Sequence, residues 1–236
     1  MSPLWLSQLA AHVRSLFPAG ASGFPDCFPD EVELVDRRKY AIQAHGPERE
    51  WKVYGRAWSK VTGICLHQTA CLLGERPERW DSVGAHLGVT RAGKLIWLHG
   101  FDRVVAHGNG WNAGTVGIEV DGLYAGIEGD LSTVWDDPST KVREQPMKLT
   151  PEAAGALRAA IEWIVDTVSE RGGNVRALVA HRQSSESRRS DPGEAIWKAA
   201  APIAKRLGLS DGGPGFKIGD GRPVPREWDP TRSERY

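Results

Sequence analysis

Three side chains able to bind a divalent metal stand far apart in this 236-residue sequence. His67 lies in LHQTA, His181 lies in AHRQ, and Asp191 follows soon after it in RRSDPG. Two imidazoles and one carboxylate leave one position of a tetrahedral zinc ion open, and an open position distinguishes a catalytic zinc from a structural one. A fold that gathers them on one ion must bring two remote segments of the chain together.

A potential catalytic acid lies between these ligands in the sequence. Glu119 occurs in TVGIEVDG, a run that is typical of a strand. A metal ion with a nearby carboxylate is the minimum equipment for hydrolysing an amide, because the carboxylate takes a proton from water and passes it to the leaving amine. The ligand set and Glu119 together favour hydrolytic chemistry.

The order of strand and helix signals predicts an α/β fold with a central mixed β-sheet flanked by helices. Strand signals occur in residues 61–68, 85–90, 94–99, 115–120 and 177–180. The second and third of these segments flank a short glycine-containing turn and are typical of a hairpin. The candidate ligands fall at strand ends or in adjoining loops, where α/β sheets usually carry their sites.

Helix signals dominate the last third of the chain. Residues 150–152 read Thr-Pro-Glu, which supplies a capping hydroxyl, a proline at the first helical position and an acid near the positive end of the dipole. An apolar face then continues to the glycines of 171–173, and 194–207 form a second amphipathic segment. A short helix or turn is predicted over 75–82, and a long irregular excursion over 123–147.

Three parts are predicted along the chain. They are an N-terminal extension over 1–50, a main domain over 51–209 and an irregular tail, rich in glycine, proline and charge, over 210–236. Helical spacing in the extension predicts an amphipathic helix through Leu6, Leu9, Val13 and Leu16. The apolar residues expected to dock the tail are Phe216, Ile218 and Trp228.

The formal charges cancel, with 30 lysines and arginines against 30 acidic residues. This balance argues against broad electrostatic capture of nucleic acid or of an anionic membrane. No apolar run approaches the ~20 residues that span a bilayer. The first residues lack a positively charged start, so we expect no standard signal peptide and a chain that is cytoplasmic as synthesised. Export by another route stays open.

The three cysteines, Cys27, Cys65 and Cys71, are odd in number and form no CxxC pair. They favour a reducing compartment and free thiols over a disulfide scaffold. Cys65 falls in a predicted strand and is expected in the core. Cys71 comes shortly after His67 and is a weaker, alternative metal ligand.

Four segments of the sequence resemble one known family in their order and separation. They are LHQTA, SVGAHLGVTRAGKLIWL, AHGNGWNAGTVGIEVDG and AHRQSSESRRSDPG. Together they resemble the zinc-dependent N-acetylmuramoyl-L-alanine amidases of the type 2 amidase and peptidoglycan-recognition-protein family. The resemblance covers roughly residues 60 to 208 and implies the fold of that family.

The resemblance also implies roles for individual residues. His67, His181 and Asp191 match the zinc ligands of the family, and Glu119 matches its general base. Arg189 falls where hydrolytic members usually have a lysine that stabilises the tetrahedral oxyanion. Arginine keeps the positive charge, but its reach and shape differ from those of lysine.

Two further positions bear on the mechanism. Arg188 is an alternative to its neighbour Arg189 as the cation of the site. Ala85 occupies the position of an active-site tyrosine in some phage relatives, so we do not expect a tyrosine-dependent mechanism.

Five residues are candidates for contact with substrate. Trp111 and Asn112 resemble the wall of the family's cleft, where an indole can pack on a sugar or peptide and an amide can bond a carbonyl. Thr69 is expected to line the pocket. His86 and His107 occupy family-like positions, with substrate contact or orientation of the ligands as their functions. Core packing is the alternative for Trp111 and for both histidines.

The ligand and catalytic residues also have plainer interpretations. A buried histidine is often only a hydrogen-bonded core residue. Asp191 suits a turn or a helix cap, and Glu119 suits a solvated edge strand. Arg189 belongs to a charge run, and such runs are usually solvated.

The sequence therefore predicts a Zn²⁺ enzyme that hydrolyses the amide between N-acetylmuramic acid and L-alanine in peptidoglycan or its muropeptide fragments. A non-catalytic peptidoglycan-binding module of the same fold is one alternative, and a zinc enzyme acting on another amide is a second. A recycling enzyme, a phage endolysin and an injected effector all suit these features. We expect a monomer.

Overall fold

The computed structural model describes residues 32–46, 48–135 and 145–236. The helix predicted near the N-terminus and Cys27 lie outside these ranges, as do residues 136–144 of the predicted excursion. Within the described ranges, none of the helices combines the length and hydropathy required to cross a bilayer.

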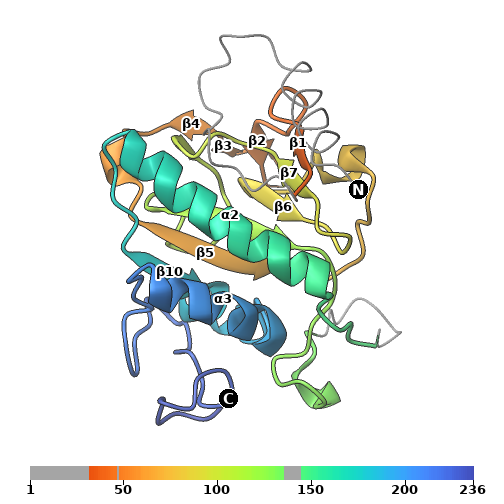
Figure 1. The fold of residues 1–236 in the computed structure, drawn as a ribbon, viewed down its shortest axis with the longest axis vertical. Helices are drawn as coiled ribbons and strands as arrows, with labels where there is room; N and C mark the ends of the chain where they lie inside the picture. Colours follow the sequence, from red (N-terminus) through yellow and green to blue (C-terminus); the bar gives the residue numbers. More distant parts are fainter. Residues whose placement is uncertain (1–31, 47, 136–144) are drawn as a thin grey trace, which may run out of the picture.

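A six-stranded mixed sheet forms the centre of the molecule, in the order β1-β7-β6-β9-β5-β10 (Figure 1). Its strands are β1 (Leu34–Asp36), β5 (Gly63–Gln68), β6 (Leu87–Val89), β7 (Leu95–Trp97), β9 (Thr115–Val120) and β10 (Ala177–Ala180). Strands β6, β9, β5 and β10 run parallel to one another, whereas β7 is antiparallel to β6. The prediction of an α/β fold with a central mixed sheet is confirmed.

All strands of the central sheet except β1 form where the apolar runs predicted them. All six residues of β5 are buried, as expected for a strand that lies between two parallel neighbours with both faces covered. The hairpin of β6 and β7 closes through Gly93, whose φ of +86° suits glycine because it has no Cβ. β1, which comes from the region predicted as an extension, pairs with β7 at the sheet edge. The division into three parts stays a prediction.

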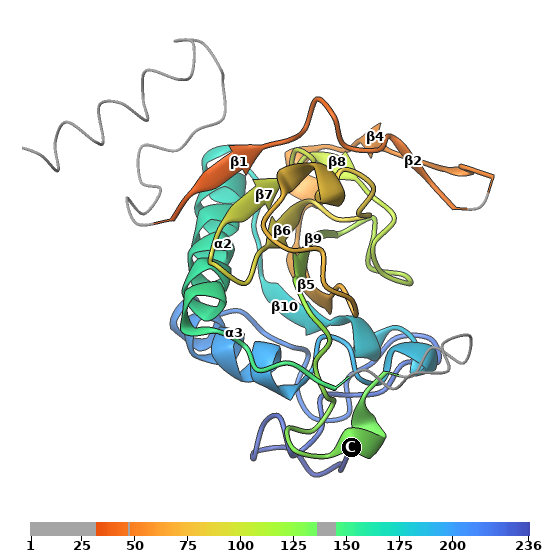
Figure 2. The ribbon, with the colours of Figure 1, turned by 90° about the vertical axis from the view of Figure 1, so that its right-hand side faces the viewer.

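Two helices cover one face of the sheet, α2 (Pro151–Glu170) and α3 (Glu194–Arg206). Figure 2 shows both helices on the same side of the strands. The Oγ1 of Thr150 caps α2 by accepting a hydrogen bond of 3.1 Å from the amide of Ala153, as the sequence predicts. In the part of the chain that the structure describes, the other helical elements are five short 3₁₀ turns: η1 (Trp58–Lys60), η2 (Pro77–Trp80), η3 (Leu131–Thr133), η4 (His181–Gln183) and η5 (Glu186–Arg188).

The alternation of side chains in β5 and β9 decides which residues face away from the helices. Leu66 of β5 and Ile118 of β9 belong to the main hydrophobic core that the helices cover. Successive side chains of a strand point to opposite faces. His67 and Glu119 therefore point to the other face, and the strand register pairs them directly.

Two small antiparallel sheets lie beyond that other face (Figure 2). One pairs β2 (Ala44–His45) with β3 (Trp51–Lys52), and the other pairs β4 (Tyr54–Gly55) with β8 (Arg103–Val104). Each strand has only two residues, which is too short to carry a period that a sequence could reveal. These strands were not among the predicted elements.

The C-terminal tail packs against the main domain. Trp228 is buried, its ring lies 6.1 Å from that of Trp197 on α3, and its indole donates a hydrogen bond to the carbonyl of Gly126. Phe216 and Ile218 are only half-buried. Of the three apolar residues expected to dock the tail, Trp228 makes the deepest contact.

Candidate functional site

The three predicted ligands meet at the carboxyl end of the sheet. His67 lies near the end of β5, and His181 directly follows β10, the parallel neighbour of β5. Asp191 comes from the loop that leads into α3. The Nδ1 atoms of the two histidines are 2.9 Å apart, and Oδ2 of Asp191 lies 2.9 Å from Nδ1 of His181 and 3.9 Å from Nδ1 of His67.

These distances fit a tetrahedral zinc site. Bonds of about 2.0–2.1 Å at tetrahedral angles separate neighbouring ligand atoms by roughly 3.3 Å. The observed separations of 2.9 to 3.9 Å bracket that value. The residues present therefore suit Zn²⁺ in number, chemistry and spacing, with Nδ1 as the ligand atom of both histidines.

A second group with metal-binding potential contains Cys65, His67 and His107. All three residues are buried, and burial raises the pKa of the Cys65 thiol well above its ordinary value. A metal ligand must be a thiolate, so this group is the poorer site. Cys71 belongs to neither group within the described part of the chain.

The electrostatics of the site keep its ligands in the forms that bind metal. Burial, with His181 nearby, lowers the pKa of His67 from 6.5 to about 4, so its ring is neutral near pH 7. Burial alone would raise the pKa of Asp191, but the adjacent imidazoles of His181 and His67 outweigh it, and the net shift is downward. A neutral imidazole and an ionised carboxylate are the states that zinc requires.

The other ring nitrogen of each histidine has a partner that fixes its orientation. Nε2 of His181 lies 2.9 Å from Oδ1 of Asn109, an acceptor, so Nε2 carries the proton and Nδ1 keeps its lone pair. Nε2 of His67 lies 3.0 Å from Nδ1 of His107 in the same arrangement. Such partners orient metal-binding rings and raise their basicity.

Gln68 ties the end of β5 to the loop that carries the third ligand. Its backbone N–H donates a hydrogen bond to Oδ1 of Asp191 at 3.0 Å. Its side chain donates to the carbonyls of Ser190 at 2.8 Å and Tyr124 at 3.1 Å, and accepts from the amide of Tyr124. These bonds leave Oδ2 of Asp191 directed at the histidines.

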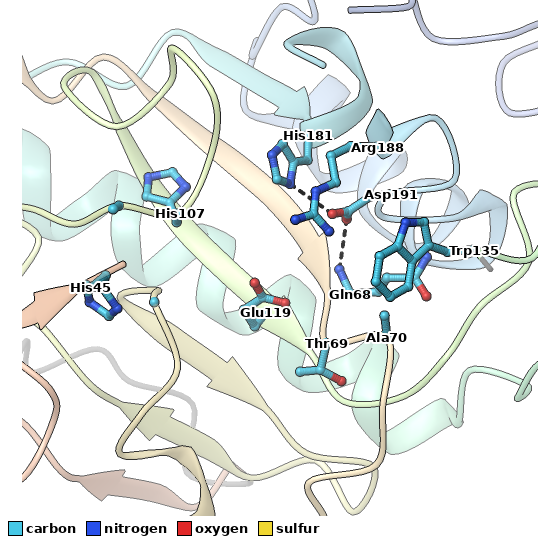
Figure 3. Close-up of a pocket in the computed structure, with 12 residues that line it drawn as sticks. His45, Gln68, Thr69, Ala70, His107, Glu119, Trp135, His181, Arg188 and Asp191 are labelled. Carbon is cyan, nitrogen blue, oxygen red and sulfur yellow. Dashed lines mark hydrogen bonds and ion pairs between the residues drawn. The ribbon is translucent and has the colours of Figure 1, made fainter. Parts of the chain in front are cut away.

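Glu119 lies in the pocket that adjoins the ligands (Figure 3). One carboxylate oxygen, Oε2, is buried and finds no hydrogen-bond partner among the described residues. Burial, reinforced by the charge of Asp191 and opposed by Arg188, raises the pKa of Glu119 well above its ordinary value. A buried and unpaired carboxyl oxygen in a pocket is the kind of group that functional sites use.

The pocket has a volume of about 290 Å³. Its lining comes from several elements that are distant in sequence: His45, Gln68, Thr69, Ala70, Gly84, Ala106, His107, Glu119, Trp135, His181, Arg188 and Asp191.

Arg188, and not Arg189, is the cation of the pocket. Arg188 lines the cavity beside Asp191, and its guanidinium lies over the ring of Trp135 at 5.5 Å. The side chain of Arg189 is exposed and lines neither this pocket nor its larger neighbour. Arg188 is the last residue of η5 and Arg189 follows it, so the two side chains point in different directions. Sequence spacing alone does not reveal which of them faces the pocket.

Two of the predicted substrate contacts lie beside the ligands. Thr69 lines the pocket, with its hydroxyl donating to the carbonyl of Cys71 at 2.7 Å. Asn112 lines an adjoining larger cavity. Its Oδ1 accepts hydrogen bonds from the amides of His107 at 2.9 Å and Gly108 at 2.7 Å, so it also shapes this loop.

The remaining predicted contacts are more deeply placed. His86 is fully buried, with Nδ1 accepting from the amide of Gly117 at 2.9 Å and Nε2 lying 2.9 Å from the carbonyl of Arg103. Both of its nitrogens are thus occupied, and we assign it a structural role. His107 lines the pocket and orients the first ligand histidine. Trp111 is half-buried and lines neither cavity.

Sequence reasoning missed several residues of the site. Asn109 stands between His107 and Trp111 in a motif already recognised, and its amide was a usable signal. His45 and Trp135 gave none, because only the fold brings them to the pocket.

The fold and the cluster together define an α/β protein with a candidate metal centre at the carboxyl edge of its sheet. The chain belongs to the N-acetylmuramoyl-L-alanine amidase family, whose profile matches residues 57–194. A comparison with curated protein sequences gave no match.

Solved structures of similar shape include endolysins and peptidoglycan recognition proteins. One is the endolysin N-acetylmuramoyl-L-alanine amidase LysCS from Clostridium intestinale, with 15% identity over 76% of this chain and 97% of that chain and a TM-score of 0.49. Drosophila PGRP-LB has 17% identity over 77% of this chain and 98% of that chain, with a TM-score of 0.49. The Ph2119 endolysin from a Thermus scotoductus bacteriophage has 16% identity over 75% and 100%, with a TM-score of 0.45.

Proposed function

We propose that this protein is a zinc-dependent amidase that hydrolyses the bond between N-acetylmuramic acid and L-alanine in peptidoglycan or its fragments. The observation that carries the proposal is the convergence of His67, His181 and Asp191, whose ligand atoms lie within 4.8 Å of one another. Membership of the amidase family supports the choice of bond and substrate.

The ligand residues would hold Zn²⁺ through Nδ1 of His67, Nδ1 of His181 and Oδ2 of Asp191. When bound, the ion supplies Lewis acidity that polarises an amide carbonyl and makes water more acidic. Asn109 contacts Nε2 of His181 and His107 contacts Nε2 of His67, and these contacts keep the two imidazoles oriented. Gln68 holds the carboxylate in place through its amide N–H.

Glu119 acts as the general base and then as the general acid. Its carboxylate takes a proton from the attacking water and delivers it to the nitrogen of the leaving L-alanine. Burial favours the protonated form of Glu119, whereas a divalent cation nearby favours the carboxylate. A cation held by the three ligand residues would therefore favour the form of Glu119 that accepts a proton.

Arg188 stabilises the negative charge that develops on the carbonyl oxygen of the scissile amide. Its guanidinium offers several N–H donors, and contact with Trp135 limits the directions in which they point. A positioned charge of this kind favours the transition state, because it needs no reorganisation during the reaction. Thr69 and Asn112 are proposed to contact the substrate. The monomeric state of the protein stays a prediction.

The proposal is tested by incubating the zinc-loaded protein with purified muropeptides and reading the products by mass spectrometry. The expected products are a free stem peptide that begins with L-alanine and a sugar that keeps its lactyl carboxylate. An Asp191→Ala variant serves as the matched control and is expected to release neither product.

The non-catalytic alternative makes a different prediction in the same experiment. A peptidoglycan-binding module would retain muropeptide on the zinc-loaded protein and release no stem peptide. The complete set of three ligands favours the enzyme, because a binding module has no need of an open metal position.

A further inference from the structure

A second and larger cavity adjoins the candidate active site. It has a volume of about 780 Å³, against about 290 Å³ for the pocket that holds Glu119. The two cavities share the residues Ala106, His107, His181 and Arg188. A ligand can therefore occupy both at once, with its middle beside the metal ligand His181.

Two exposed aromatic side chains line the larger cavity. Trp51 of β3 and Tyr54 of β4 are each 56% exposed, which is unusual for aromatics of this size in a folded domain. Both residues precede the segment 57–194 that matches the amidase family. Strands β3 and β4 therefore add to the groove a wall that the family segment does not contain.

The rest of the wall combines polar side chains with small apolar ones. Glu50 and Lys52 flank Trp51, and Asn109 and Asn112 contribute from the loop opposite. Exposed aromatic faces beside carboxylate, ammonium and amide groups suit a saccharide. The rings can pack on the apolar face of a pyranose, and the polar groups can bond its hydroxyls and acetamido groups.

The proposed substrate has two parts, just as the groove has two cavities. The scissile amide joins a sugar on one side to a peptide on the other, so a substrate bound at the metal must extend in two directions. We propose that the larger cavity is a glycan subsite, in which Trp51 and Tyr54 bind sugar residues next to the muramoyl group. This inference rests on the proposed function and specifies its substrate as a saccharide-bearing strand.

A glycan subsite makes turnover depend on sugars beyond the scissile bond. Binding energy from these remote sugars lowers the barrier only if the aromatics are present. The protein is then expected to favour muropeptides that carry N-acetylglucosamine on the muramoyl group over muramoyl-peptides without it.

The kinetic test compares these two substrates in wild type, Trp51→Ala and Tyr54→Ala. Each variant is expected to lose about tenfold more kcat/KM on the disaccharide-peptide than on the muramoyl-peptide. The substitution removes the aromatic ring, so the additional sugar loses the apolar surface on which it packs. Tyr40→Ala is the matched control, because Tyr40 is 57% exposed and lines neither cavity. Equal losses on both substrates would overturn the subsite.

A binding test keeps the two proposals distinguishable. The peptide-free disaccharide of N-acetylglucosamine and N-acetylmuramic acid has no scissile amide and is added to the zinc-loaded Glu119→Gln variant. We expect the NMR signal of the Trp51 indole N–H to shift in a saturable manner as the disaccharide is added. The signal is identified by its loss in Trp51→Phe. Shifts caused by the stem peptide and not by the disaccharide would overturn a glycan occupant.

The combinations of outcomes separate the claims. Disaccharide binding without hydrolysis of any muropeptide would remove the proposed activity and keep the subsite. Hydrolysis without discrimination between substrates, and without disaccharide binding, would remove the subsite and keep the activity.

Discussion

His67 and Glu119 are register partners on adjacent parallel strands, β5 and β9, and both face away from the helices. Two strands therefore place the proposed metal ligand His67 beside the carboxylate of Glu119 without help from a loop. Rigid elements hold such groups more accurately than loops do. This relationship is the basis of the proposed division of labour between metal binding and proton transfer.

Replacing Glu119 with Gln separates these two tasks. The variant keeps the shape of the side chain but cannot accept a proton, so kcat is expected to fall by about 10²–10⁴-fold. Zinc content, measured by atomic emission on the same preparation, is expected to stay equal to that of wild type. A variant that retains full turnover would remove Glu119 from the mechanism.

Arg188 and Arg189 offer a paired test within one turn of chain. Arg188→Ala is expected to lower kcat by about 10²-fold, the effect of losing one donor to the developing oxyanion. Arg189→Ala changes an exposed side chain and is expected to leave kcat near the wild-type value. Steady-state kinetics on one muropeptide compares the two, and the reverse order would restore Arg189 as the catalytic cation.

The partner of His181 is expected to tune metal affinity. Asn109→Ala removes the acceptor of the Nε2 hydrogen bond and should weaken zinc binding by about 10–100-fold. Asn109→Asp keeps an acceptor and should restore most of the affinity. Competition with a chromophoric chelator measures both, and unchanged affinity in Asn109→Ala would show that this contact does not support the ligand.

His99 predicts a loss of stability in mild acid. Burial, aided by the charges of His45 and Arg103, lowers its pKa from 6.5 to about 4. The unfolded chain thus binds more protons than the folded protein between these values, and stability falls as the pH drops through that window. At pH 5 the contribution of this residue is a loss of about 2 kcal/mol relative to pH 7.5.

Urea unfolding at both pH values tests this prediction. Nε2 of His99 is buried without a hydrogen-bond partner among the described residues, so His99→Phe removes the titrating group without breaking a side-chain hydrogen bond. The variant is expected to show a smaller difference in free energy of unfolding between the two pH values. An unchanged difference would assign the acid sensitivity to other groups.

Much of the fold could be predicted, because its elements carry strong local signals. The buried run that becomes β5, the hairpin of β6 and β7, and the cap at Thr150 all depend on residues close in sequence. The convergence of His67, His181 and Asp191 was also predictable, since each lies in a recognisable motif at a strand end or in an adjoining loop.

The parts that escaped prediction depend on contacts between distant segments. The two-residue strands β2 and β3 have no period, yet they place His45 and Trp51 on the walls of the cavities. Arg188 and Arg189 share one charge run, and only the geometry of the turn after η5 decides which of them faces the pocket. Tertiary packing, rather than local propensity, determines these features.

X-ray absorption at the zinc edge of the metal-loaded protein tests the central claim most directly. If His67, His181 and Asp191 hold the ion, the spectrum will contain only nitrogen and oxygen neighbours at about 2.0–2.2 Å, with imidazole scattering. A sulfur neighbour near 2.3 Å would place the metal at Cys65 instead, and a protein that takes up no zinc would contradict the account altogether.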